Sequence, residues 1–192
     1  MTAELATVPA AQQETAPTPS AMRRALGAFA TGVTVVTGLD ADEPVGFACQ
    51  SFASVSLDPP LVLFCADHSG RTWPRIRKAG RFSVNVLAED QTDLCARFGS
   101  SRGRKFDGLD WDLSRWGTPS LRGVLMRAHA EVRAVHTAGD HDVVVGRVLG
   151  LETAAGPRPM LFFQGQFGVP ERQDVLSDAV APGLWGWADP WD

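Results

Sequence analysis

The residues best placed to do chemistry form a short polar stretch, 69–72, with the sequence Ser-Gly-Arg-Thr directly before Trp73 and Pro74. Proline is favoured in the first turn of a helix, and Ser or Thr before it can cap free amide groups. Gly80 would end that helix. Two hydroxyls, one guanidinium and the positive end of a helix dipole together favour a phosphate. An ordinary capped helix with a solvated arginine is the alternative.

A second stretch, 44–64, places small side chains between two apolar segments. Large and small residues alternate over 45–49, which indicates a strand with one buried face. The residues that follow are mostly small or hydroxylated, namely Ala48, Ser51, Ala53, Ser54 and Ser56. Residues 58–60 (Asp-Pro-Pro) then interrupt the ladder, and 61–64 are all apolar, as in a strand covered on both faces. Such a corridor would let a flat ligand approach the backbone, although a sandwich strand with a Ser-rich turn has the same pattern.

Several other chemistries are excluded by the sequence. No G-x-G-x-x-G, Walker-type or G-x-S-x-G motif is present, and the chain has no tyrosine. His136 and His141 flank a predicted turn, and Asp140 or Asp142 would have to supply a third zinc ligand. That spacing matches no established zinc pattern, so we predict no metal site.

Composition indicates one soluble domain. The chain has 192 residues, of which 44% are hydrophobic and 21% charged, and its net charge of −4 argues against a nucleic-acid partner. Three scattered cysteines indicate reduced thiols and a cytoplasmic setting. No apolar run approaches the ~20 residues needed to span a bilayer. Residues 1–20 are typical of a disordered leader.

The periodicity predicts a mainly antiparallel β-barrel with short helices, because no βαβ alternation is present. Helices are expected at 21–30 (with Ser20 as N-cap), 73–79 and 89–98; strands are expected at 33–37, 45–49, 61–64, 82–87, 126–136, 143–151 and 159–167. Residues 99–108 form a basic loop, and 109–123 are irregular. The alternation over 126–136 places His129 on the charged face, opposite Ala128 and Ala130.

In this order and spacing, the segments ALGAFATGVTVVT, GFACQSFASVSLDPPLVLF, HSGRTW, GRFSVNVL, CARFG, GDH and RPMLFFQGQF resemble the short-chain flavin reductases. These are the NAD(P)H:flavin oxidoreductase partners of two-component monooxygenases. The resemblance covers about residues 21–168. It implies a homodimeric FMN-binding split barrel of antiparallel Greek-key topology over 21–170, followed by a Trp-rich tail over 171–192 whose role is open.

The resemblance also implies a set of site residues. Ala48, Cys49, Gln50 and Ser51 would run along the isoalloxazine edge and ribityl chain, with Ser54 beside them. Ser69, Arg71 and Thr72 would meet the phosphate, while Phe98, Lys105 and Phe106 would lie near the outer end of the flavin. The Gly139-Asp140-His141 segment would lie near the nicotinamide, with His141 as the catalytic residue. The choices of FMN or FAD, and of NADH or NADPH, stay open, as does the identity of the partner oxygenase.

Three alternatives remain at this point. A non-catalytic flavin- or haem-binding module would bind cofactor without consuming NADH. A relative of pyridoxamine-phosphate oxidase would need a second cationic phosphate site beyond Arg71 and the 102–105 loop. A docking protein would depend on the Trp-rich tail.

Overall fold

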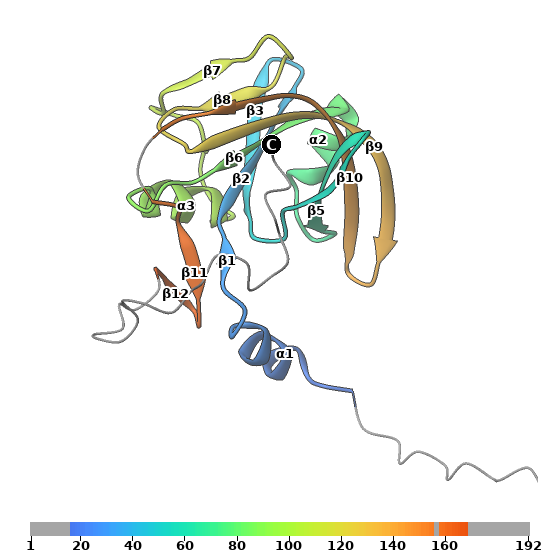
Figure 1. The fold of residues 1–192 in the computed structure, drawn as a ribbon, viewed down its shortest axis with the longest axis vertical. Coiled ribbons are helices and arrows are strands. Elements are labelled where there is room, and N and C mark those ends of the chain that lie inside the picture. Colours follow the sequence, from blue (N-terminus) through green and yellow to red (C-terminus); the bar gives the residue numbers. More distant parts are fainter. Residues whose placement is uncertain (1–15, 156–157, 169–192) are drawn as a thin grey trace, which may run out of the picture.

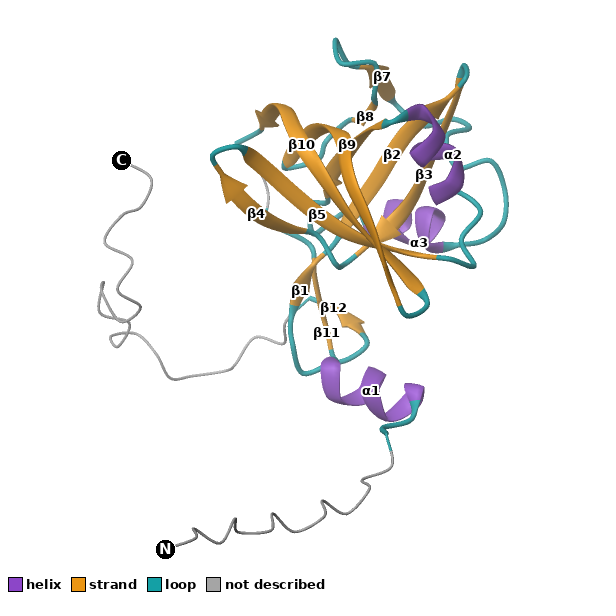
Figure 2. Ribbon diagram, turned by 90° about the vertical axis from the view of Figure 1, so that its right-hand side faces the viewer, coloured by secondary structure: helices purple, strands orange, loops and turns teal. Residues whose placement is uncertain are grey.

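The fold is organised around one seven-stranded sheet, in which every pairing is antiparallel. The computed structural model describes residues 16–155 and 158–168. The strands run in the order β3-β2-β6-β9-β10-β5-β4, and the sheet curls around its own interior (Figure 2). Their bounds are β2 (Thr34–Asp40), β3 (Glu43–Cys49), β4 (Ala53–Leu57), β5 (Pro60–Asp67), β6 (Arg81–Val86), β9 (Met126–Ala138) and β10 (His141–Thr153).

Smaller elements surround this sheet (Figure 1). An arm on one side contains α1 (Pro19–Leu26), β1 (Thr31–Gly32), β11 (Leu161–Phe163) and β12 (Gln166–Phe167). The remaining elements are α2 (Trp73–Ala79), α3 (Thr92–Gly99) and the hairpin of β7 (Trp111–Leu113) and β8 (Pro119–Leu121). Figures 1 and 2 both show α1 standing away from the barrel.

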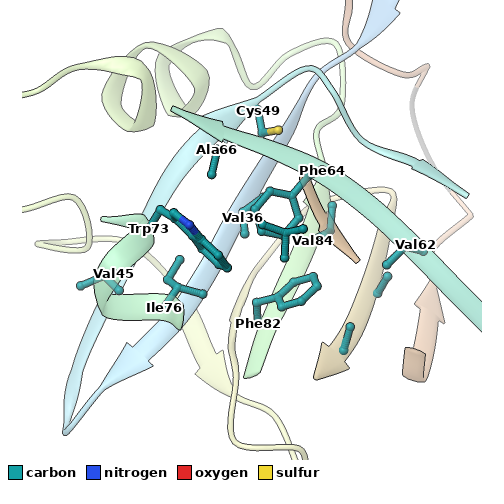
Figure 3. Close-up of a cluster of buried hydrophobic side chains, with 13 residues drawn as sticks. Val36, Val45, Cys49, Val62, Phe64, Ala66, Trp73, Ile76, Phe82 and Val84 are labelled. Atoms are coloured by element: carbon teal, nitrogen blue, oxygen red, sulfur yellow. The ribbon is translucent and has the colours of Figure 1, made fainter. Parts of the chain in front are cut away.

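Aromatic and aliphatic side chains fill the barrel (Figure 3). Phe64 is at the centre, with edge-on contacts to Trp73 at 5.6 Å and Phe82 at 5.1 Å between ring centroids. Gly146 lies against Phe82, since a Cβ there would be 2.4 Å from its ring. A second apolar cluster, which includes Leu87, packs outside the barrel around α3. The barrel strands and α3 are therefore packed together, so they can hold the residues of a site in fixed positions.

The seam of the barrel is closed by side chains. The described strands include no β3–β5 ladder; instead, the Ser51 hydroxyl accepts a hydrogen bond from the Cys65 amide at 2.8 Å. The Cys49 thiol lies 3.2 Å from the same hydroxyl. The end of β3 is thus joined to β5 by two short side chains.

The prediction of a mainly β, antiparallel barrel is confirmed, while several boundaries differ. The first helix starts at Pro19, within the predicted leader, and ends at Leu26; Thr18, not Ser20, caps it by accepting from the Ala21 amide. The expected strand 159–167 is two strands, because Gln164 and Gly165 adopt positive φ and turn the chain. Residues 1–15 of the leader and the Trp-rich tail lie outside the described residues.

The burial of side chains differs from expectation in β5 and in the neighbouring strand β4. Residues 61–64 are not covered on both faces: Val62 and Phe64 are buried, whereas Leu61 and Leu63 are half-buried. The reason is that β4, formed by residues expected to be a corridor, is an edge strand with an exposed outer face.

His129 is fully buried, contrary to its predicted place on a charged outer face. The 109–123 segment, expected to be irregular, contains the β7–β8 hairpin, and residues at its turn cover His129. Trp116 stacks on its ring at 4.3 Å, and the Thr118 hydroxyl lies 2.7 Å from its Nδ1. Its Nε2 has no hydrogen-bond partner within the described part of the chain and lies 3.7 Å from a Glu152 oxygen. Alternation alone could not reveal this cover.

This burial predicts a pH effect on stability. Desolvation lowers the pKa of His129 below its ordinary 6.5; Glu152 opposes the shift, and Arg127 and Arg115 reinforce it. The stabilisation by neutral His129 is therefore complete above the ordinary pKa and declines as the pH falls below it. We expect Tm to fall between about pH 7 and about pH 5 more steeply in the wild type than in His129→Gln. Parallel Tm profiles for the two proteins would contradict this.

Candidate functional site

A cavity of about 640 Å³ opens between β3, the loop before α2, and the end of α3. Helices α2 and α3 lie on the same side of the barrel in Figure 2. The cavity brings together six of the expected site residues, namely Ala48, Ser69, Arg71, Thr72, Phe98 and Lys105. Gly46 also lines the cavity. A Cβ there would lie 2.8 Å from the Phe98 ring, so the glycine lets Phe98 pack closely against β3.

The loop 67–72 shapes the cationic wall of the cavity. The Asp67 carboxylate accepts from the Ser69 amide at 2.7 Å, and its backbone carbonyl accepts from the Gly70 amide at 3.0 Å. The backbone and side-chain hydrogen bonds from Ser69 lower the pKa of Asp67. Thr72 is the N-cap residue of α2, but its side chain makes no capping hydrogen bond. The loop thus presents Ser69, Thr72 and the Arg71 guanidinium to the cavity on a fixed backbone.

Helix α2 follows the sequence prediction closely. It spans Trp73–Ala79 with Pro74 in its first turn, and Gly80 ends it at φ 74° in the left-handed region. Its Arg75 side chain donates to Asp40 at 2.7 Å and to Glu43 at 2.5 Å. These carboxylates raise the pKa of Arg75, and they pair with its positive charge. Arg75 and Glu43 also line the cavity, and neither stood out in the sequence, because their pairing depends on the tertiary fold.

Lys105 lines the cavity, but its ammonium is already engaged. It donates to the backbone carbonyls of Arg97, Ser100 and Arg102. Desolvation and the nearby charge of Arg71 lower the pKa of Lys105. Arg71 in turn donates to the Ser101 carbonyl at 2.7 Å. Both cations therefore hold the loop that follows α3, and they add positive charge at the rim of the cavity.

The remaining residues of the expected flavin edge do not line the cavity. Cys49 is 6% exposed and points into the barrel core (Figure 3), where burial raises the pKa of its thiol. The Ser51 hydroxyl is used in the seam, while Gln50 and Ser54 are exposed. Phe106 is buried against Phe98 at 5.2 Å, so it supports that ring from behind.

His141 lies at the end of the β9–β10 hairpin and is half-buried. Its Nδ1 is 2.7 Å from the Asp140 carboxylate, which lowers the pKa of Asp140. In the β5–β10 ladder His141 is paired with Asp67, and the His68 amide donates to the Asp140 carbonyl at 3.0 Å. The Gly-Asp-His segment and the cationic loop are therefore neighbours, although His141 is not part of the cavity wall. The described residues contain no group of three side chains suited to a metal.

Comparison with known proteins identifies the family of this chain. The model for the flavin reductase like domain matches residues 26–170. The chain belongs to the flavin reductase family. It is 47% identical over 167 residues to the reductase subunit HsaB of a flavin-dependent monooxygenase from Rhodococcus jostii, covering 87% of this chain and 83% of the relative.

Solved flavin reductase-like structures share the fold. Nitrilotriacetate monooxygenase component B from Mycobacterium thermoresistibile aligns with a TM-score of 0.76 at 46% identity, over 85% of this chain and 92% of that one. The NADH:FAD oxidoreductase SgcE6 of Streptomyces globisporus, in complex with NAD and FAD fragments, aligns with a TM-score of 0.75 at 33% identity, over 80% and 93%. The predicted family, split-barrel fold and oxidoreductase class are thus confirmed for this flavin reductase.

Proposed function

We propose that this flavin reductase transfers a hydride from NADH or NADPH to FMN or FAD and delivers the reduced flavin to a partner monooxygenase. The observation that carries the proposal is the cationic loop 67–72, which lines a cavity beside the Gly-Asp-His hairpin. The similarity to HsaB, a monooxygenase reductase subunit, supports the delivery step.

The donor set of the cavity suits a flavin phosphate. Ser69 and Thr72 offer hydroxyls, and Arg71 offers a guanidinium whose geometry matches phosphate oxygens. Backbone amides near Ala48 and the exposed Gln50 would follow the ring and its ribityl chain. When bound, the flavin ring supplies the redox chemistry by accepting a hydride. The protein's part is to fix the ring near the hairpin, so that the nicotinamide meets it in a reactive geometry.

His141 would orient the nicotinamide. It lies next to the cationic loop in the β5–β10 ladder, and its Nδ1 pairs with Asp140 while the rest of the ring stays accessible. A ring held in this way can stack on the dinucleotide or donate to its amide. His141 therefore acts in positioning the hydride donor.

Anaerobic mixing of purified protein, NADH and FMN or FAD tests the proposal directly. Bleaching of the flavin absorbance at a rate that rises with protein concentration is the expected result. Flavin binding without NADH consumption would instead identify a non-catalytic binding module. A protein that elutes colourless from gel filtration, yet turns over added flavin, would support diffusible delivery to the oxygenase.

A homodimer and a cytoplasmic location complete the proposal. Met22, Leu26 and Phe29 of the α1 arm are strongly exposed, and a second copy would cover them. Light scattering during gel filtration tests this, with a monomeric mass as the contrary result. Among the described helices, none has the length and apolar character needed to cross a membrane. All three cysteines are free, in keeping with a reducing compartment.

A further inference from the structure

A buried carboxylate joins the cationic loop to the hairpin. Asp142, the residue after His141, is 5% exposed. Its Oδ2 accepts from the Trp73 indole N–H at 2.9 Å and lies 3.5 Å from the Arg77 guanidinium. Its Oδ1 accepts from His68 Nε2 at 2.9 Å and from the Thr137 hydroxyl at 3.1 Å.

The donors around Asp142 come from three separate elements. Thr137 lies opposite it in the β9–β10 ladder, His68 lies in the cationic loop, and Trp73 is the first residue of α2. Trp73 is also a wall of the cavity and packs edge-on against Phe64. A single side chain therefore links the hairpin end, the loop and the helix that frame the site.

The carboxylate is ionised under ordinary conditions. The hydrogen bonds from Trp73 and then His68 lower the pKa of Asp142 to about 2. Because an ionised carboxylate can only accept, His68 Nε2 carries the proton in this contact. Three N–H and O–H donors thus converge on one negative charge, and hydrogen bonds to a charged acceptor are stronger than those between neutral groups.

We infer that Asp142 is a positioning residue, which holds the cationic loop and the Trp73 wall against the Gly-Asp-His hairpin and so sets the affinities for flavin and NAD(P)H together. This inference rests on the proposed function. Asp142 touches neither reactant; it acts through His68 and Trp73. It also differs from the core residues, because Trp73 lines the cavity and His68 lies in the chain between Asp67 and Ser69, which line it too.

Asparagine cannot replace Asp142 without loss. Its neutral amide has one acceptor oxygen and an NH₂ group, so either the Trp73 indole N–H faces another donor, or His68 and Thr137 must change from donors to acceptors. In both cases the negative charge that draws the three donors together is lost. Leaving a buried donor unpaired carries a large penalty, and the loop would relax away from the hairpin. We expect Asp142→Asn to raise the flavin Kd and the KM for NADH each by roughly tenfold, with a smaller change in kcat.

Two substitutions of His68, the partner of Asp142, supply an independent test. His68→Ala removes the donor and should raise both constants in the same direction. His68→Gln retains an N–H near the Nε2 position and should restore them toward the wild type. Flavin Kd is measured by fluorescence titration, and KM and kcat by steady-state NADH oxidation with FMN.

Two controls separate positioning from loss of stability. Val84→Ala removes buried volume from the barrel core; it should lower Tm while leaving the flavin Kd and the KM for NADH unchanged. Asp112→Asn removes an exposed carboxylate that pairs with Arg122, far from the site, and should change neither constant.

Unchanged flavin Kd and NADH KM in Asp142→Asn would overturn the inference, whatever the change in Tm. If that variant does not fold, equal constants in His68→Ala and the wild type would overturn it instead. A wild type that fails to reduce flavin would refute the proposed function, while the flavin titration would still test the role of Asp142.

Discussion

Arg71→Ala is expected to raise the flavin dissociation constant by about 10- to 100-fold, which is the loss typical of a charge-assisted hydrogen bond to phosphate. Arg71 lines the cavity beside the Ser69 and Thr72 hydroxyls, on a backbone fixed by Asp67. Its Ser101 contact would also be lost, so the loop after α3 would become more mobile. Fluorescence titration with FMN and with FAD measures the effect.

The matched control for Arg71→Ala is Arg133→Ala. Arg133 is an exposed arginine of β9 that does not line the cavity. This variant loses the same charge, so a comparable rise in Kd would mean that net charge, not a local contact, attracts the flavin. An unchanged titration for Arg71→Ala would move the phosphate site elsewhere.

His141→Ala is expected to raise the KM for NADH by about tenfold or more, while the flavin Kd changes by less than about twofold. The reason is geometric: His141 lies next to the cationic loop but outside the cavity wall. Loss of its ring therefore removes an orienting surface for the nicotinamide and leaves the phosphate ligands in place. Steady-state kinetics with varied NADH at saturating flavin gives the first constant, and titration the second.

His136→Ala serves as the control for His141→Ala. His136 is the other histidine near the same turn, on the paired strand β9. Its removal should leave both constants near the wild-type values. Equal losses for NADH and flavin in His141→Ala would refute the assignment of His141 to the nicotinamide side.

The sequence predicted the parts of the site that depend on local chemistry. The start of α2 at Trp73 and its end at Gly80 follow from Pro74 and from the left-handed conformation that glycine adopts freely. The cationic loop before α2 is predicted from the same local pattern, because its residues directly precede the start of that helix. The family resemblance implies that Ala48 and Phe98 lie near the same flavin, which spacing alone could not indicate, and both residues line one cavity in the structure.

Contacts between distant segments were beyond the reach of the sequence pattern. His129 was expected on a polar face because its neighbours alternate, yet Trp116 from a separate loop covers it. Lys105 is expected near the outer end of the flavin and does line the cavity, but the sequence does not reveal that its ammonium is held by the carbonyls of Arg97, Ser100 and Arg102. In the sequence, Asp142 stands out only as a possible metal ligand, since two of its partners in the structure lie 69 and 74 positions away in the chain.

The closure of the barrel by Ser51 and Cys49 has a consequence for its local motions. A ladder of backbone bonds opens only cooperatively, whereas a joint made by one hydroxyl and one thiol can part by side-chain rotation. The amide of Cys65 donates to the Ser51 hydroxyl, so its protection from hydrogen exchange depends on one side-chain contact. Its deuterium uptake should outpace that of its ladder-bonded neighbours in β5, and bound flavin should slow it if the ring rests across this joint.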